Sequence, residues 1–212
     1  SVRISAYSQT FFSRIYALFP VPRRRFSLPF FRRFAIMMHM DNEKDNFRKE
    51  SAETHCMLCP VKCGANRSVR AGYCGVRGMN IAKYYLHPYE EPCISFAKGS
   101  GTIFFTGCNL KCVFCQNYEV SRAERGMPIT PARLAEIFRE LEDAGADNVS
   151  LVTPSHLIGD IEKAFKIYRP KIPVVYNSGG YDDTESLKRI DDYIDIYLPD
   201  LKYVSPFLSE RY

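Results

Sequence analysis

The stretch GTIFFTGCNLKCVFCQN, residues 101–117, decides the fold and the chemistry expected of this chain. It opens on a short apolar, β-prone run and continues into Cys108, Cys112 and Cys115, spaced by three and then two residues. Three thiolates on one short loop can hold three irons of a [4Fe-4S] cluster, which leaves the fourth iron open to a non-protein ligand. A three-thiolate zinc site or plain buried cysteines are the alternatives. Zinc sites usually use paired knuckles separated by a longer stretch, so the compact triplet favours the cluster.

Strand and helix signals alternate after this stretch. Residues 134–141 and 161–168 place apolar side chains at helical spacing, and Thr130-Pro131 is a good N-cap and first-turn pair for the first helix. A shorter helix is expected at 185–193. The β-prone runs that alternate with these helices are residues 101–106, 148–153, 172–176 and 195–198.

Alternating strands and helices predict parallel βαβ units with right-handed connections. The fold class is therefore α/β, a partial (β/α) barrel with about four of six βα units, preceded by a small Cys-rich metal-binding module. Three regions follow from this reading: an extension at 1–50 that is disordered, mis-annotated at its start or a targeting segment, the metal module with its connector at 51–100, and the barrel core at 101–212, which is expected to be truncated at its C-terminus.

Charge gives no case for a nucleic-acid partner of the folded part. The net charge is +5, but residues 1–36 hold seven arginines and no acidic residue, so the remainder is close to neutral. No stretch approaches the roughly 20 apolar residues of a membrane-spanning helix. The cysteine spacings favour metal ligation in a reducing compartment, so we expect a cytoplasmic protein, or an organellar one if residues 1–36 are a transit peptide.

A second group of cysteines precedes the barrel. Cys56, Cys59, Cys63 and Cys74 supply four thiolates within 19 residues, in a segment rich in glycine. Four thiolates satisfy either a structural zinc site or a fully ligated auxiliary iron-sulfur cluster.

The x3 and x2 spacing, with the aromatic Phe114 just before the third cysteine, resembles the signature of the radical S-adenosylmethionine (SAM) superfamily. From Cys56 to Tyr212 the chain resembles its pyruvate formate-lyase activating enzyme-like branch, in the group with an N-terminal Cys-rich segment. The resemblance implies a radical SAM barrel and a [4Fe-4S] cluster that binds SAM. It also implies reductive cleavage of SAM to a 5'-deoxyadenosyl radical, which abstracts hydrogen from a substrate.

The resemblance also implies which residues hold SAM. The positions that match lie in YNSGGYD and LPDLKY, at the ends of the third and fourth expected strands, where α/β folds bind ligands. Residues at i and i+2 of a strand share a face, so the two charged side chains of LPDLKY are expected to point into the same space. The matching residues are Asn177, Ser178, Gly179, Gly180, Asp200 and Lys202, together with Phe114 on the cluster loop.

The chain departs from the superfamily at the end of the second expected strand. Many members carry Gly-Gly-Glu there to grip the SAM amino group, whereas this chain has Thr153-Pro154-Ser155-His156. Thr153, Ser155 or His156 offers a replacement hydrogen-bonding group. His156 is interpreted either as a polar residue in solvent at a helix N-terminus or as a functional group.

The leading hypothesis is a radical SAM oxidoreductase of the activating type, with SAM, a reducing electron donor and a glycyl radical enzyme as partners. One alternative is a non-catalytic zinc or iron-sulfur binding module. Another is that this chain is an inactive fragment of such an enzyme.

Overall fold

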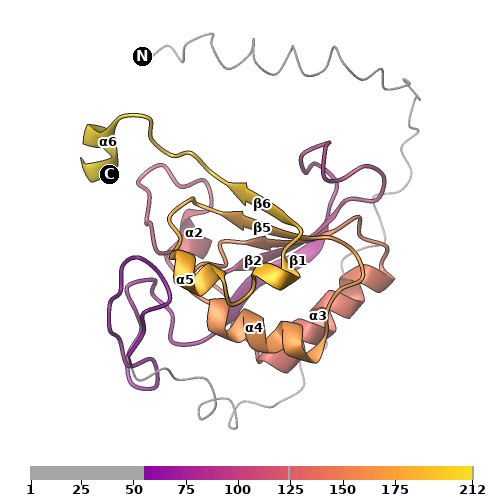
Figure 1. Cartoon of the computed structure of the whole chain (residues 1–212), viewed down its shortest axis with the longest axis horizontal. Helices are drawn as coiled ribbons and strands as arrows, with labels where there is room; N and C mark the ends of the chain where they lie inside the picture. The colour runs from indigo at the N-terminus through magenta and orange to yellow at the C-terminus, as the bar shows by residue number, and fades with distance from the viewer. Residues whose placement is uncertain (1–54, 124, 212) are drawn as a thin grey trace. The chain divides into compact units, whose positions relative to one another are not determined.

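A computed structural model describes residues 55–123 and 125–211, and the extension expected at 1–50 lies outside them. Its framework is one sheet of six strands in the order β3-β1-β2-β4-β5-β6 (Figure 1). Four strands pair in parallel and in chain order, as the alternating pattern predicts. These strands are β2 (Ser100–Phe105), β4 (Val149–Val152), β5 (Val174–Ser178) and β6 (Ile196–Pro199).

The sheet is mixed rather than wholly parallel. β1 (Asn80–His87) pairs antiparallel with β2, and the two-residue β3 (Met127–Pro128) pairs antiparallel with β1. The sequence predicts a metal module and a connector at 51–100 and no strand there, whereas the structure has β1 in this region. The run NIAKYYLH is β-prone, but it directly follows the glycine-rich cysteine segment, whose composition indicates a loop rather than a strand.

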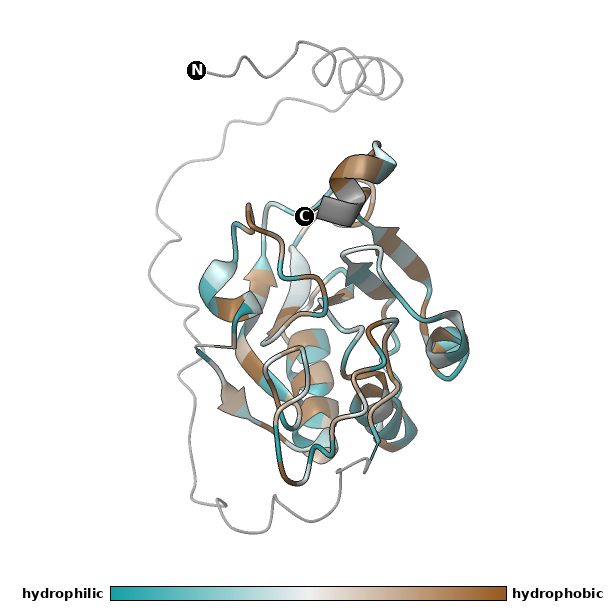
Figure 2. Cartoon of the chain, turned by 90° about the vertical axis from the view of Figure 1, so that its left-hand side faces the viewer, coloured by the Kyte–Doolittle hydropathy of each residue, from teal (hydrophilic) through white to brown (hydrophobic). Residues whose placement is uncertain are grey.

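Helices α3 (Pro131–Asp143) and α4 (Ile158–Ile167) lie together against the sheet (Figure 1). Thr130 caps α3 as expected, because its side chain accepts a hydrogen bond from the Arg133 N–H at 3.0 Å. In Figure 2 each helix carries both hydrophobic and hydrophilic residues, as an amphipathic packing helix does. The short helices are α2 (Tyr118–Ser121), α5 (Thr184–Leu187) and α6 (Pro206–Arg211).

The helix expected at 185–193 is interrupted. It consists of α5 and a separate 3-10 turn, Asp191–Tyr193, because the chain bends between them to place Ile190 in the core. The core itself lies between the sheet and α3 with α4. Ile103, Leu134, Phe138, Leu151 and Ile161 are completely buried there.

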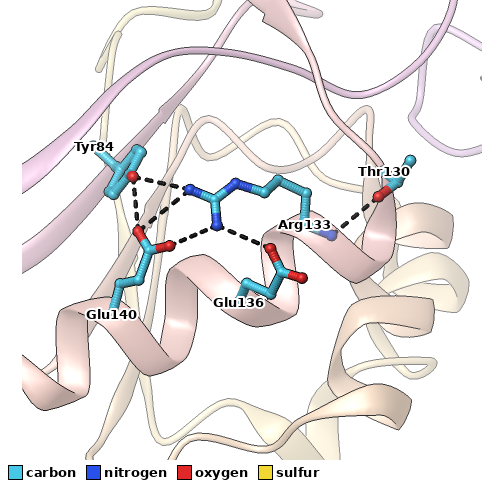
Figure 3. A network of polar contacts seen from close by, with 5 residues as sticks. All are labelled: Tyr84, Thr130, Arg133, Glu136 and Glu140. Carbon is cyan, nitrogen blue, oxygen red and sulfur yellow. Dashed lines mark hydrogen bonds and ion pairs between the residues drawn. The ribbon is translucent and has the colours of Figure 1, made fainter. Parts of the chain in front are cut away.

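A polar network fastens β1 to α3 on the rim of this core (Figure 3). The Tyr84 hydroxyl donates to Glu140 at 2.7 Å, and Arg133 bridges Glu140 and Glu136 at 2.6 and 3.0 Å. The same guanidinium donates to the Tyr84 hydroxyl oxygen at 3.1 Å. The strand that the sequence reading missed is thus tied to a helix that it found.

The Cys-rich segment is continuous with the core. Cys74, Val76 and Met79 are buried within the same apolar cluster as the strands. A domain boundary near residue 100 stays a prediction. In the part of the chain that the structure describes, no helix is long and apolar enough to cross a membrane.

Candidate functional site

The segments expected to carry the site all follow the carboxyl ends of parallel strands. The cysteine loop follows β2, the Thr153–His156 segment follows β4, the glycine pair follows β5, and Asp200 with Lys202 follows β6. Adjacent parallel strands put these ends at one edge of the sheet. The structure therefore gathers these four segments at one edge of the sheet.

The cysteine loop is held by backbone hydrogen bonds at its base. The Gly107 N–H donates to the Val120 carbonyl at 2.9 Å, and the Cys108 N–H donates to the Cys74 carbonyl at 3.3 Å. Gly107 has φ +82°, and a Cβ there would lie 2.5 Å from the Cys74 carbonyl oxygen. Only glycine fits this position, because a side chain would both strain the backbone and collide with it.

Cys108, Cys112 and Cys115 form one thiol group within this loop. The Leu110 N–H lies 3.4 Å from the Cys108 sulfur, and the Cys115 N–H donates to the Cys112 carbonyl at 3.3 Å. Burial raises the pKa of Cys112, and the neighbouring sulfurs of Cys108 and Cys115 raise it further. Within the described residues the three thiols are not arranged as a preformed site for a single metal ion. Three thiolates on one loop are nevertheless a donor set that fits three irons of a cubane cluster.

Lys202 lies beside these thiols. Burial opposes its charge, but the hydrogen bond to Asp200 and the sulfurs of Cys112 and Cys115 outweigh that effect and raise its pKa. Asp200 and Lys202 form an ion pair, which agrees with the expectation that the two side chains share one space. A fixed positive charge next to the thiols favours their thiolate form.

Ser155 and Ser178 are brought together by Asp182, a residue that the sequence reading did not single out. The hydroxyl of Ser178 donates to Asp182 at 2.6 Å, that of Tyr176 at 2.8 Å, and Ser155 donates to the same carboxylate. Burial and the nearby Asp182 charge raise the pKa of Tyr176. The sequence signal for Asp182 was a carboxylate two residues beyond a Gly-Gly turn, which alone does not distinguish it from a solvated turn residue.

Gly179 and Gly180 have close neighbours within the chain itself. A Cβ on Gly179 would lie 2.5 Å from Cδ1 of Leu110 in the cysteine loop. Gly180 has φ +76°, and a Cβ there would lie 2.4 Å from the Asp200 carbonyl oxygen. The close backbone approach expected at these glycines therefore includes the packing of three loops against one another.

Asn109 links two of these loops and was also missed. Its side-chain amide donates to the Tyr181 carbonyl at 2.6 Å, and the residue is almost completely buried. It connects the cysteine loop to the segment after β5. Because it stands between Cys108 and Cys112, two predicted ligands, sequence offered only its position as a signal.

Thr153 and Asn177 adjoin across the strand ends, where the Thr153 N–H donates to the Asn177 carbonyl at 2.9 Å. Thr153 has φ +61°, a conformation that is strained for a β-branched residue. Phe114 is more than half exposed, and its ring meets that of Tyr203 edge-on at 5.8 Å.

His156 is completely buried, so the interpretation of it as a polar residue in solvent was wrong. Its Nε2 donates to the Thr106 carbonyl at 2.9 Å, just before the cysteine loop. Nδ1 is buried and has no hydrogen-bond partner among the described residues. Burial lowers the pKa of His156 to about 4. The hydrogen bond to the Thr106 carbonyl acts against this shift, and the positive charge of Arg67 adds to it. The residue is therefore neutral near pH 7.

This burial predicts a pH dependence of stability. The pKa of His156 falls from 6.5 to about 4 on folding, so the unfolded chain binds more protons between these values. The free energy of unfolding should fall by up to about 3 kcal/mol as pH is lowered through this window. Urea unfolding of wild type and His156→Gln, which keeps a donor for Thr106, checks it. Equal pH dependence of the two proteins would contradict the assignment.

Comparisons with known proteins identify the family of this chain. The model of the radical SAM superfamily matches residues 102–212, more than half of the chain. An uncharacterized protein of Methanocaldococcus jannaschii is 33% identical over 168 residues, which covers 74% of this chain and 48% of that relative. The chain thus spans about half the length of that relative. No solved structure gives a significant match. On the family match, the chain belongs to the radical SAM superfamily.

Proposed function

We propose that this chain forms the SAM-binding part of a radical SAM oxidoreductase, with Cys108, Cys112 and Cys115 as the cluster ligands. The observation that carries the proposal is one loop with three cysteines, of which Cys108 and Cys115 both act electrostatically on Cys112, at the edge where three other predicted segments meet. When bound, the [4Fe-4S] cluster and SAM supply an electron and a 5'-deoxyadenosyl radical for hydrogen abstraction.

The chain's own residues bind and orient SAM in this proposal. Ser155 and Ser178 donate their protons to Asp182, so their oxygens would be the acceptors for the SAM ammonium group. Each oxygen already accepts one hydrogen bond, from the Tyr176 hydroxyl at 3.4 Å and from the Gly180 N–H at 3.1 Å, and would use its second lone pair. Lys202, held by Asp200, balances negative charge at the cluster and the SAM carboxylate.

Asn177 and Thr153 complete the polar side of the SAM site, with Gly179 and Gly180 as backbone contacts. Phe114 gives an apolar surface next to the cysteine loop.

The first experiment is anaerobic reconstitution with iron and sulfide, followed by EPR of the dithionite-reduced protein with and without SAM. A reduced-cluster signal whose g-values shift on adding SAM supports an open iron that binds SAM. Appearance of 5'-deoxyadenosine supports cleavage. If the sample takes up only zinc, the alternative of a non-catalytic metal-binding module is supported. If it binds SAM without cleaving it, the alternative of an inactive fragment is supported.

For the substrate we propose an activase-type reaction, in which the hydrogen comes from a backbone glycine of a glycyl radical enzyme. The support is the likeness of residues 101–117 and of YNSGGYD to the pyruvate formate-lyase activating enzyme-like branch. Turnover with a glycyl radical enzyme and a reducing electron donor should give a glycyl EPR doublet. Uncoupled 5'-deoxyadenosine without a doublet would point to a different substrate. The free thiols and the exposed loop fit a reducing compartment such as the cytoplasm.

Replacement of Thr153 separates strain from function. Thr153→Gly relieves the positive φ and should raise the free energy of unfolding by about 1 kcal/mol. Loss of the hydroxyl should weaken SAM binding roughly fivefold, the value of one net hydrogen bond. Isothermal titration with SAM and urea unfolding measure the two effects. Thr153→Ser is the matched control because it keeps the hydroxyl, and a Gly variant that binds SAM as well as wild type would remove Thr153 from the site.

A further inference from the structure

The four N-terminal cysteines converge outside the site described above. Cys56, Cys59 and Cys74 are buried and Cys63 is half-buried, and all four are free thiols. Burial raises the pKa of Cys59, and the sulfurs of the other three cysteines act on it in the same direction. The four thiols therefore lie within electrostatic reach of one another.

Two tight turns bring these thiols together. The Cys56 N–H donates to the Ala65 carbonyl at 3.1 Å and the Gly64 N–H donates back to the Cys56 carbonyl at 3.0 Å, which closes the first turn. The second turn runs through Gly72, whose N–H donates to the Val76 carbonyl at 3.1 Å. A Cβ on Gly72 would lie 3.4 Å from the Cys74 sulfur and 3.5 Å from the Cys63 sulfur. The absent side chain leaves space between these two sulfurs.

A buried arginine faces this thiol group. Arg67 is only 5% exposed, and its Nη2 lies 3.2 Å from the Cys74 sulfur. Its charge also acts on Cys56 and on Cys63. A guanidinium cannot lose its proton, so its burial needs compensating negative charge. The buried carboxyl group of Asp160 also acts on Arg67, but less strongly than the sulfurs of Cys74 and Cys56. Protonated thiols supply no negative charge at the contact itself, whereas metal-bound thiolates do.

We propose that Cys56, Cys59, Cys63 and Cys74 hold a second metal centre with four thiolate ligands, zinc or a fully ligated iron-sulfur cluster, and that Arg67 balances part of its negative charge. Within the described residues the thiols do not form a preformed group for a single metal ion, so ligation requires rotation of cysteine side chains. Four thiolates carry four negative charges, and either a zinc ion or a cubane core leaves an excess that Arg67 reduces.

The second centre also supports the loop of the first. The carbonyl of its ligand Cys74 accepts the Cys108 N–H, and Gly107 packs on that same carbonyl. Metal bound at Cys74 would thus fix the base of the cysteine loop. This supporting role rests on the proposed function of that loop, whereas the metal site itself does not.

Metal analysis of the full chain tests the site independently of SAM chemistry. In a variant with Cys108, Cys112 and Cys115 all replaced by serine, we expect either one zinc or about four irons with matching sulfide to remain per chain. Further replacement of Cys59 and Cys63 by serine should remove that metal. Cys93→Ala, at an exposed cysteine outside both groups, should change nothing. Metal well below one per chain in the triple variant would overturn the proposal, while the SAM-dependent EPR signal of the wild type would still test the proposed function.

A second measurement isolates Arg67. Competition with a chelator in the triple-serine background should show metal bound 10- to 100-fold more weakly in Arg67→Met, the usual effect of losing a group that contacts a metal ligand. Arg67→Lys keeps the charge and should recover part of the affinity. If Arg67→Met binds the metal as tightly as the background that keeps Arg67, the arginine does not balance the negative charge of the metal centre. The circular dichroism of each variant, compared with wild type, shows whether the fold is retained.

Discussion

Replacing Cys112 by alanine should abolish SAM-dependent activity and remove the SAM-sensitive EPR signal. Cys112 is the central ligand of the x3 and x2 triplet, and its sulfur acts electrostatically with those of Cys108 and Cys115. With only two thiolates left on the loop, a cubane cluster loses one of its three protein bonds and is open at two irons. We expect 5'-deoxyadenosine formation at the background rate, a loss of at least about 1000-fold, since the cofactor carries the chemistry. Anaerobic assay of reconstituted proteins measures it.

Cys93→Ala is the control for this change, because Cys93 is exposed and stands apart from both cysteine groups. It should keep wild-type activity and cluster absorbance. If Cys112→Ala also retains a cluster that responds to SAM, the three-cysteine loop is not the cluster site. The N-terminal cysteines would then have to be considered as the ligands of the SAM-responsive cluster.

The parallel part of the fold was predictable because its signals are local. Each strand is an apolar run between breakers, and α3 has a capping residue, a proline at its first turn and a clear helical period. β1 was missed because it directly follows a segment rich in cysteine and glycine, and its mostly half-buried side chains show no clear alternation. The break after α5 was missed because it depends on packing of Ile190 into the core, which is a tertiary effect.

The candidate residues of the site could be predicted from sequence, but the contacts that join them could not. Cysteine spacing predicts the cluster ligands, which stay a prediction, and the strand ends place Ser178 and Lys202 at the same edge. Asp182, Asn109 and Arg67 act through contacts with residues 4 to 72 positions away, and no spacing rule encodes such contacts. The burial of His156 likewise follows from the Thr106 carbonyl lying against it.

Gly107→Ala should be among the most destabilising single methyl additions in the described part of the chain. The new Cβ would require a left-handed backbone, which costs about 1–2 kcal/mol for a non-glycine residue. It would also lie 2.5 Å from the Cys74 carbonyl oxygen, 3.1 Å from Val76 and 3.2 Å from His156, so overpacking adds about 1–3 kcal/mol. We expect a loss of about 3–4 kcal/mol in the free energy of unfolding, measured by urea titration.

Gly145→Ala separates the two contributions to this loss. Gly145 has φ +81°, almost the same as Gly107, but its Cβ would meet only the flexible Lys98 side chain. Its substitution should cost only the backbone strain, about 1–2 kcal/mol. The difference between the two variants then measures how tightly the Cys74 carbonyl is held against the cysteine loop. Equal losses would mean that the loop moves away freely, and the second cysteine group would then give the first no mechanical support.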